Sequence, residues 1–400
     1  ETLCDRALVE RVDGEYKLHP LIRDEAVERL NNSPDWKKAN QVAAEFWSDS
    51  VKSIKNTQDA SKALEAAFHY LNDDDYQKAA EVICKRRPYS YSQQLFHGVS
   101  LGATLGGSFI RLGISERIYA IIDKILLHIP RNYFASKLYN LLGDICWIKG
   151  DVQVAIENHL KSGNIANYLL ESGADKCYLI GTIVNDVVCL FNVGICKIDI
   201  GEFEEGLIYL NRVISKTKDS ELLSSYSMRA LCNLASSLAL CGNIEDAAKI
   251  VAVVESNLES VKLGVRSTAY RLYHLGKTFQ YLGDTEKSFI YYDKSLKYCQ
   301  EISFLQGAAV ATMGLGEVYR VKAKFLKSLS NHDQAIDILQ KINAKCDLAE
   351  AYYQLALTYQ AMNDRPNSQL YFQKALTLWE KIEAPKQIER VRQSMELGSV

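Results

Sequence analysis

The stretch from Ala269 to Tyr298 constrains the fold of this chain more than any other part of the sequence. Apolar and small residues recur there at steps of three and four on both sides of Leu282-Gly283-Asp284. This spacing places the apolar residues on one face of a helix, and the Gly-Asp step between the two runs is typical of a turn. The stretch therefore predicts two amphipathic helices packed as a hairpin, with Gly276 small enough to let the second helix approach the first.

The same pattern recurs seven more times, with starts near Ala60, Val99, Ser136, Val187, Met228, Ala309 and Ala349. It resembles the pattern of tetratricopeptide repeats, whose common unit has about 34 residues. Here successive starts lie 39, 37, 51, 41, 41, 40 and 40 residues apart, so each helix is expected to be longer by about one turn. The longest step predicts an extended second helix between Leu160 and Leu179, with a loop around Gly173. The expected fold is an all-α solenoid of about eight helical hairpins.

The N-terminal residues do not follow the repeat pattern. Two short alternating segments, Ala7–Arg11 and Glu15–Leu18, flank Asp13-Gly14, a dipeptide that favours the turn of a β-hairpin. Pro20 suits the first position of a following helix, and Trp36 to Ile54 predicts one long helix. We therefore expect three parts: a hairpin and helix over residues 1–34, a linking helix over 35–58 and the repeat array over 59–400.

The hairpin and the run Leu18-His19-Pro20-Leu21-Ile22-Arg23 resemble the end of the winged-helix domain in STAND (NB-ARC-like) signalling ATPases. Leu64-Glu65-Ala66-Ala67 and the acidic turn Asp73-Asp74-Asp75 look like the first repeat unit that follows this domain in bacterial members. The resemblance implies a nucleotide-binding module upstream, which the array could contact, and a nucleotide-sensing role for His19. Only the histidine of the family's Met-His-Asp motif is retained, with Leu18 and Pro20 as departures. The alternative is that residues 1–34 form a cap on the solenoid.

Charge and cysteine usage narrow the class of protein. The formal net charge is −2 with no long run of one sign, which argues against nucleic acid or an anionic membrane as the main partner. Ten single cysteines without a C-x-x-C pair suit a reducing compartment, and no signal peptide is visible, so we expect a cytoplasmic protein. The most apolar stretch, Tyr178 to Ile200, contains Asn185, Asp186, Asn192 and Lys197, so we predict a core helix rather than a membrane span.

The sequence contains no recognisable catalytic motif. Gly276-Lys277-Thr278 lacks the upstream glycine and the preceding strand of a phosphate-binding loop. The seven histidines do not cluster with one another or with a cysteine pair, so no metal site is predicted. No nucleophile with a spaced base appears. We therefore expect a chain without enzymatic activity, cofactor or metal.

The concave surface remains as the candidate site, because the first helix of each unit lines the inner wall in arrays of this kind. The predicted partner-binding residues on this wall are Tyr270, Tyr273, Lys277, Gln280, Tyr281, Glu317, Arg320, Tyr353 and Gln360. The clamp of Lys, Asn and Arg by which some family members hold a peptide's terminal carboxylate is absent. Tyrosines offer a large contact area with a polar tip, which suits a protein or peptide. Alternatively, some of these tyrosines pack between adjacent repeats.

Three functions are compatible with this pattern. The first is the sensor arm of a STAND-like signalling ATPase that recognises a protein or peptide on its concave face. The second is a free-standing adaptor that scaffolds other proteins. The third is the inducer-binding region of a transcription regulator, which a resemblance to maltose-regulator-like proteins would allow. An enclosed polar pocket would favour the inducer, and an open aromatic groove would favour a protein partner.

Overall fold

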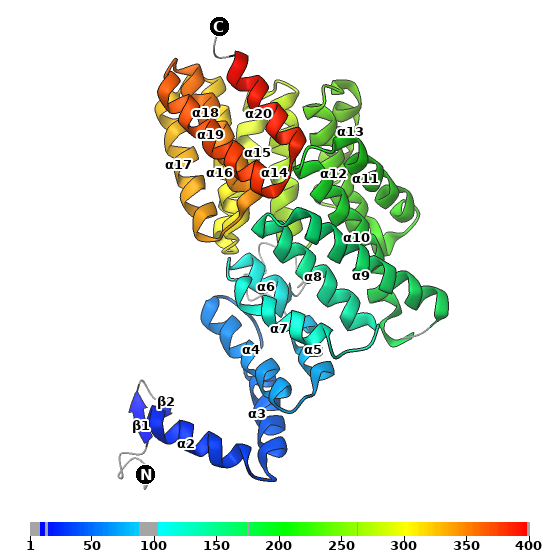
Figure 1. Ribbon diagram of the computed structural model, residues 1–400. Helices are drawn as coiled ribbons and strands as arrows, with labels where there is room; N and C mark the ends of the chain where they lie inside the picture. The colour runs from blue at the N-terminus through cyan, green and yellow to red at the C-terminus, as the bar shows by residue number, and fades with distance from the viewer. Residues whose placement is uncertain (1–8, 13–14, 88–102, 174–175, 262, 398–400) are drawn as a thin grey trace.

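The computed structural model describes residues 9–12, 15–87, 103–173, 176–261 and 263–397. Strands β1 (Val9–Val12) and β2 (Glu15–Leu18) pair antiparallel, with Val9 opposite Leu18, which confirms the predicted β-hairpin. Its Asp13-Gly14 turn lies outside the described residues. Helices α2 (Pro20–Asn31) and α3 (Trp36–Ser50) follow, and Figure 1 shows the hairpin and α2 lying away from the array, with α3 leading into it.

The linking helix is shorter than the sequence predicts. It ends at Ser50, and Val51 has extended backbone angles, with φ −104° and ψ 94°. Val51 and Ile54 are both buried in the main hydrophobic cluster. The predicted end at Ile54 is therefore wrong, because an extended chain lets these two β-branched side chains reach the core in a segment that links α3 to the array.

Eight helical hairpins and a final helix make up the array in the described part of the chain, which confirms the all-α solenoid. The first helices of the hairpins are α4 (Thr57–Asn72), α6 (Leu105–Arg111), α8 (Tyr133–Lys149), α10 (Leu179–Asp199), α12 (Ser224–Leu240), α14 (Val265–Tyr281), α16 (Leu305–Val321) and α18 (Lys345–Ala361). Their second helices are α5 (Tyr76–Cys84), α7 (Glu116–Leu126), α9 (Val152–Ser172), α11 (Phe203–Thr217), α13 (Ile244–Ser256), α15 (Thr285–Glu301), α17 (Phe325–Lys341) and α19 (Arg365–Ile382). Helix α20 (Pro385–Leu397) follows the last hairpin.

Four short elements lie between the hairpins in the described part of the chain. Strands β3 (Arg86–Arg87) and β4 (Ala103–Thr104) pair antiparallel before α6. The predicted repeat start near Val99 lies outside the described residues, and the helix of that unit begins at Leu105. Short 3₁₀ turns, η2 (Lys176–Tyr178) and η3 (Glu221–Leu223), precede α10 and α12.

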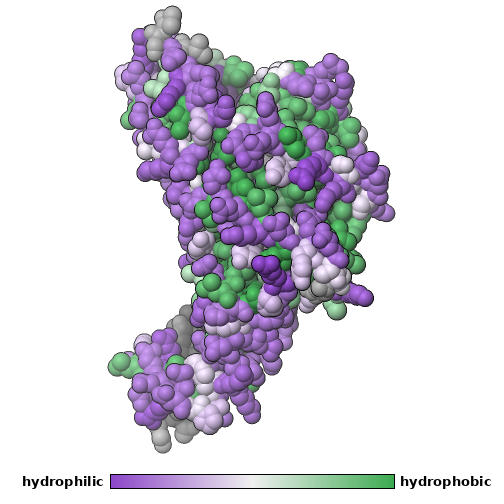
Figure 2. Space-filling model, turned by 45° about the vertical axis from the view of Figure 1, so that its right-hand side comes forward, coloured by the Kyte–Doolittle hydropathy of each residue, from purple (hydrophilic) through white to green (hydrophobic). Residues whose placement is uncertain are grey.

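The long step between the third and fourth repeats is built as predicted. Helix α9 has 21 residues and ends at Ser172, because the next residue, Gly173, adopts a left-handed backbone (φ 62°) that stops the helix. The segment Lys176–Asp199, which contains α10, is long and apolar enough by composition to cross a membrane. Half of its most apolar window is buried inside the array, where Asp186 accepts a hydrogen bond from Lys216 at 2.6 Å. Figure 2 shows that apolar side chains reach the surface mainly over the array, whereas the N-terminal extension is largely hydrophilic.

The array curls until its last helices meet its early ones. Gln387 Nε2 of α20 donates a hydrogen bond to the carbonyl oxygen of Asp199 at 2.7 Å. The Cys346 thiol of α18 lies 3.9 Å from the carbonyl oxygen of Trp147 in α8. The bond between Gln387 and Asp199 joins the first turn of α20 to the last residue of α10, and in Figure 1 α20 then runs on to the C-terminus at the top. The concave face is therefore surrounded by helices from both halves of the array.

Small residues set the spacing of the helices inside the repeats. The Tyr292 ring of α15 is 1% exposed. A Cβ at Gly276 of α14 would lie 2.7 Å from this ring, and a Cβ at Gly314 of α16 would lie 2.5 Å from it. Neither helix could keep its position with a larger residue at these sites, as the sequence predicted for Gly276.

Gly314→Ala is therefore expected to lower the free energy of unfolding by at least about 1 kcal/mol, because the added methyl group overpacks the core against Tyr292. Gly163→Ala in α9 is the matched control, because its Cβ would meet nothing closer than 3.4 Å. Replacing a glycine in a helix interior by alanine there should be neutral or stabilising by up to about 1 kcal/mol. Urea denaturation followed by circular dichroism measures both changes, and equal midpoints for the two variants would contradict this packing argument.

Candidate functional site

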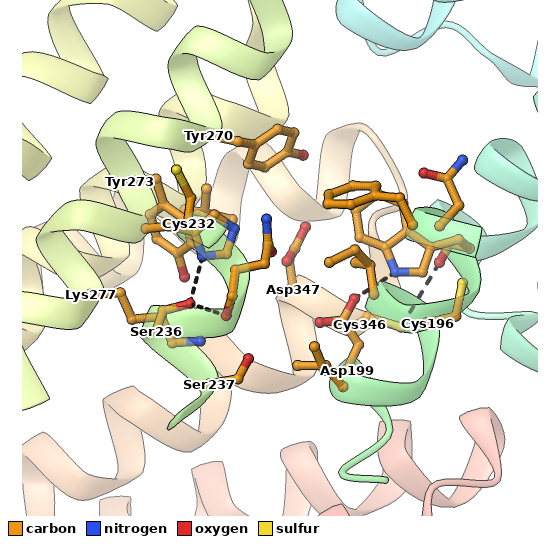
Figure 3. Close-up of a pocket in the computed structure, with 18 of the residues that line it drawn as sticks. Cys196, Asp199, Cys232, Ser236, Ser237, Tyr270, Tyr273, Lys277, Cys346 and Asp347 are labelled. Atoms are coloured by element: carbon orange, nitrogen blue, oxygen red, sulfur yellow. Dashed lines mark hydrogen bonds between the residues drawn. The ribbon is translucent and has the colours of Figure 1, made fainter. Parts of the chain in front are cut away.

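A cavity of about 320 Å³ lies inside the turn of the array. First helices of several hairpins form its walls, together with α20. Figure 3 shows side chains of α14 and α12 on one side of this space and side chains of α10 on the other. Its lining combines aromatic rings, thiols and charged groups.

Three donors on α12 and α14 form one end of the cavity. The Arg229 guanidinium lies over the Phe191 ring, with its central carbon 4.3 Å from the ring centroid. Arg266 Nη1 lies 3.8 Å from Asp144 Oδ2, beyond hydrogen-bonding distance. Within the described residues, Arg266 Nε and the Tyr270 hydroxyl are buried without a hydrogen-bond partner. Burial, and then the neighbouring Arg266 charge, lower the pKa of Arg229 from its usual value.

Two carboxyl groups, on α10 and α18, also line the cavity and form its acceptor end. Trp147 Nε1 donates to Asp199 of α10 at 2.6 Å, and Gln306 Nε2 donates to Asp347 of α18 at 2.7 Å. Burial and the charge of Asp347 raise the pKa of Asp199 to about 7, and burial raises that of Asp347 to about 6. The Lys277 charge opposes both shifts, so this side chain of α14 faces the two carboxyls. The structure nevertheless gives neither carboxyl an ion pair with a described residue.

The structure divides the predicted partner-binding residues into two groups. Tyr270, Tyr273, Lys277 and Tyr281 of α14 line the cavity. The Tyr273 ring also packs between helices, with its centroid 5.7 Å from that of Tyr292. Tyr273 therefore packs between helices, as one of the two alternatives predicts, and its role in binding a partner stays a prediction.

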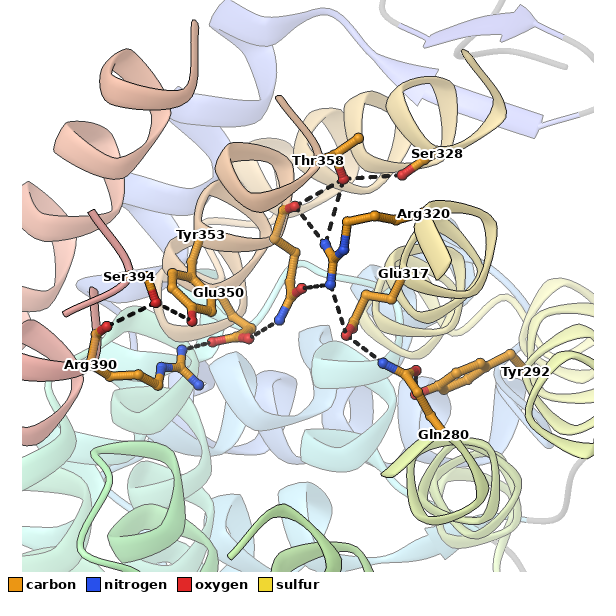
Figure 4. A network of polar contacts seen from close by, with 11 residues as sticks. Gln280, Tyr292, Glu317, Arg320, Ser328, Glu350, Tyr353, Thr358, Arg390 and Ser394 are labelled. Atoms are coloured by element: carbon orange, nitrogen blue, oxygen red, sulfur yellow. Dashed lines mark hydrogen bonds and ion pairs between the residues drawn. The ribbon is translucent and has the colours of Figure 1, made fainter. Parts of the chain in front are cut away.

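The other five predicted residues form polar contacts among α14, α16, α18 and α20, and Figure 4 shows Gln280, Glu317, Arg320 and Tyr353 in this network. Gln280 donates to Glu317 at 2.8 Å and accepts from the Tyr292 hydroxyl at 3.0 Å. Arg320 donates to the carbonyl oxygen of Gln354 at 2.9 Å. Burial raises the pKa of Glu317, against the opposing charge of Arg320. The polar groups of these residues are engaged within the array.

The network continues into α20. The hydroxyl groups of Tyr353 and Ser394 lie 3.0 Å apart, and Gln360 Nε2 donates to the carbonyl oxygen of Ser394 at 2.9 Å. Arg390 forms an ion pair with Glu350. Burial acts to raise the pKa of Glu350, but the charge of Arg390, the hydrogen bond from Gln354 and the charge of Lys277 together hold this pKa below its usual value. These contacts fix the final helix to α18.

Several lining residues were missing from the predicted set. Arg266 lies one helical turn before Tyr270, and Asp347 lies three residues before Glu350. Both lie in the extra helical turn that the long repeat spacing predicts. A predicted first helix extended by one turn at its N-terminus would have included them. Asp144 and Trp147 come from α8, across the closure of the array. The repeat periodicity does not predict that α8 lies close to the last helices of the array.

His19 lies between β2 and α2, where it precedes the first helical residue and is exposed. Its side chain makes no capping hydrogen bond. It is not among the residues that line the cavity. The nucleotide-sensing role that the family resemblance implies for His19 stays a prediction.

Tetratricopeptide repeat profiles match residues 269–301 and 307–381. These matches identify the two segments as tetratricopeptide repeats, and the stacked helical hairpins of the rest of the array form a solenoid of the tetratricopeptide type.

Two solved structures share this fold at low sequence identity. The Rap conjugation gene regulator of the plasmid pLS20, solved in complex with the Phr* peptide, is 13% identical, with a TM-score of 0.53 over 90% of this chain and 96% of that one. A STAND protein with a tetratricopeptide repeat sensor from Pyrococcus horikoshii is also 13% identical, with a TM-score of 0.50 over 99% of this chain. The match spans 57% of the STAND chain. No curated protein sequence matches this chain significantly.

Proposed function

We propose that this chain is the ligand-binding region of a regulatory protein and that its interior cavity takes a short peptide. One observation carries the proposal: charged and aromatic groups with unused hydrogen-bonding capacity surround a space of about 320 Å³ inside the array. Ligand sites are typically concave, largely apolar and supplied with a few placed polar groups, and about 300–1,000 Å³ is their usual volume. A polar cavity inside the array favours a small ligand over a large protein docked in an open groove.

The fold likeness to a Rap regulator solved with a peptide supports this class of ligand. Binding would act through the closure of the array, since the cavity is lined by α10 and α12 from one part of the chain and by α18 and α20 from another. A ligand that contacts both parts shifts the population toward the closed arrangement. The size of this shift depends on how much more tightly the ligand binds the closed arrangement than an open one. The regulatory effect of ligand binding would then depend on the pitch of the superhelix.

The sensor arm of a STAND-like ATPase is the second candidate. The antiparallel β1–β2 hairpin followed by a helix that begins at Pro20 favours it, because the resemblance to a winged-helix end rests on these elements. In that case the same cavity would receive the signal, and α3 would connect the array to the upstream module.

Filling the cavity tests the proposal. Ser267 lines it, so Ser267→Trp should occupy part of the space without placing a charge there. Ser330→Trp on α17 is the matched control, because Ser330 is exposed and does not line the cavity. We expect wild type and Ser330→Trp to retain members of a random pentapeptide pool, and Ser267→Trp to lose them, as measured by native mass spectrometry. Undiminished retention by Ser267→Trp would place the ligand elsewhere, and no retention by the wild type would end the peptide proposal.

A further inference from the structure

We propose that the cavity binds a peptide that carries both charges, with a carboxylate at Arg229, Arg266 and Tyr270 and a cationic group at Asp199 and Asp347. This inference rests on the proposed function and adds the chemistry and the orientation of the ligand. It follows from two sets of groups that line one cavity on different helices: buried donors without a hydrogen-bond partner, and carboxyl groups without an ion pair, among the described residues.

The donor end lacks an acceptor for its hydrogen bonds. Arg229 stacks its guanidinium face on Phe191, which leaves the edge that carries the N–H groups available, and a planar guanidinium suits a carboxylate. Arg266 Nε and the Tyr270 hydroxyl are buried with no partner among the described residues. Buried donors in native proteins are almost always bonded, so such a cluster indicates a missing acceptor. Two arginines face one carboxylate, Asp144, which leaves an excess of positive charge.

The acceptor end has the opposite imbalance. Asp199 and Asp347 accept hydrogen bonds from the neutral groups of Trp147 and Gln306. Glu350, which also lines the cavity, is engaged by Arg390. Lys277 is the one ammonium that acts on both carboxyl groups without forming an ion pair with a described residue. A cationic ligand group would therefore relieve the repulsion between the carboxyls.

Other charges of the array show what a purely structural role looks like. Lys216 pairs with Asp186 at 2.6 Å, and Lys197 pairs with Glu202 and with Glu205 at 2.9 Å. By contrast, the cavity places its unpaired donors and its unpaired carboxyls on different helices. Figure 3 shows the Tyr270 hydroxyl and the Asp347 carboxylate directed into the same open space. This arrangement offers both charges to a ligand, because Asp144 is the one carboxylate beside the two arginines and neither Asp199 nor Asp347 has an ion pair with a described residue.

Charge preferences in a peptide pool test the inference. The probe is an equimolar pool of random pentapeptides, prepared with free ends, an acetylated N-terminus, an amidated C-terminus or both, and incubated with the whole chain. Native mass spectrometry should show that wild type enriches peptides that carry an anionic and a cationic group. Arg229→Gln should reduce the preference for the anionic group by about tenfold or more. Asp347→Asn should reduce the preference for the cationic group by a similar factor, because the loss of one charged hydrogen bond weakens binding by about tenfold or more.

Matched controls and the end-blocked pools sharpen the result. Arg212→Gln and Asp337→Asn change exposed charges outside the cavity and should leave both preferences intact. Loss of retention on amidation would assign the carboxylate to the C-terminus, and tolerance of amidation would assign it to an Asp or Glu side chain. Retention with the same charge preferences in Arg229→Gln, Asp347→Asn and wild type would overturn the inference while leaving peptide binding in place. Absence of any retained peptide in wild type would overturn the proposed function and this inference together.

Discussion

Arg111→Met should lower the free energy of unfolding by about 3 kcal/mol, because a charged side chain that bonds two distant carbonyl groups is lost from the core. Arg111 lies at the end of α6 and is 1% exposed. Its guanidinium donates to the carbonyl oxygen of Ile302 and, at 3.0 Å, to that of Ile54. Methionine fills much of the same volume but leaves both carbonyl groups without this donor. The loss should appear as a lower urea midpoint by circular dichroism.

Arg117→Met provides the comparison. Arg117 is exposed on α7, where its Nη1 donates to the Ser61 hydroxyl at 3.3 Å. Such a surface contact is worth little, so this change should alter the free energy of unfolding by no more than about 0.5 kcal/mol. Equal losses in the two variants would mean that the bonds of Arg111 across the array contribute no more than a surface contact.

The repeat pattern predicted the local architecture because each hairpin is specified by residues close in sequence. A small residue in the first helix, such as Gly276, is needed where an aromatic ring of the second helix packs against it. The geometry of the turns was harder to predict from the sequence. Ala323-Lys324 stands where the hairpin of Ala269–Tyr298 has Gly283-Asp284, yet α16 and α17 are joined by the same kind of three-residue turn, in which Ala323 adopts a left-handed backbone with φ 54°. Packing of the two helices outweighs the preference for glycine there.

The closure of the array could not be predicted in the same way. The bonds from Arg111 to Ile302 and from Gln387 to Asp199 join residues that lie far apart in the chain and belong to no common period. These contacts depend on how the small rotations between successive repeats add up, and the spacing of residues in the sequence does not predict these rotations. For the same reason, Tyr353 and Gln360 occupied predicted wall positions but bond to Ser394 of α20, a helix outside the repeat pattern.

Acidification should destabilise the array through His332 of α17. This side chain is 0% exposed, and neither ring nitrogen has a hydrogen-bond partner in the described part of the chain. Burial, and then the Arg320 charge, lower the pKa of His332 to about 3 from an ordinary 6.5. Below pH 6.5 the unfolded chain therefore binds a proton that the folded chain excludes. The free energy of unfolding should fall as the pH decreases, by about 2 kcal/mol at pH 5 from this residue alone.

Other buried groups titrate over the same range, so the measurement must isolate His332. Burial lowers the pKa of His159 to about 4, which adds to the loss, whereas the raised pKa of Asp199, about 7, opposes it because the folded state then binds the extra proton. His332→Leu removes one group and leaves the others. The stability of this variant relative to wild type should rise by about 2 kcal/mol between pH 7.5 and pH 5. A difference that stays the same at both pH values would mean that the folded chain accommodates the His332 charge.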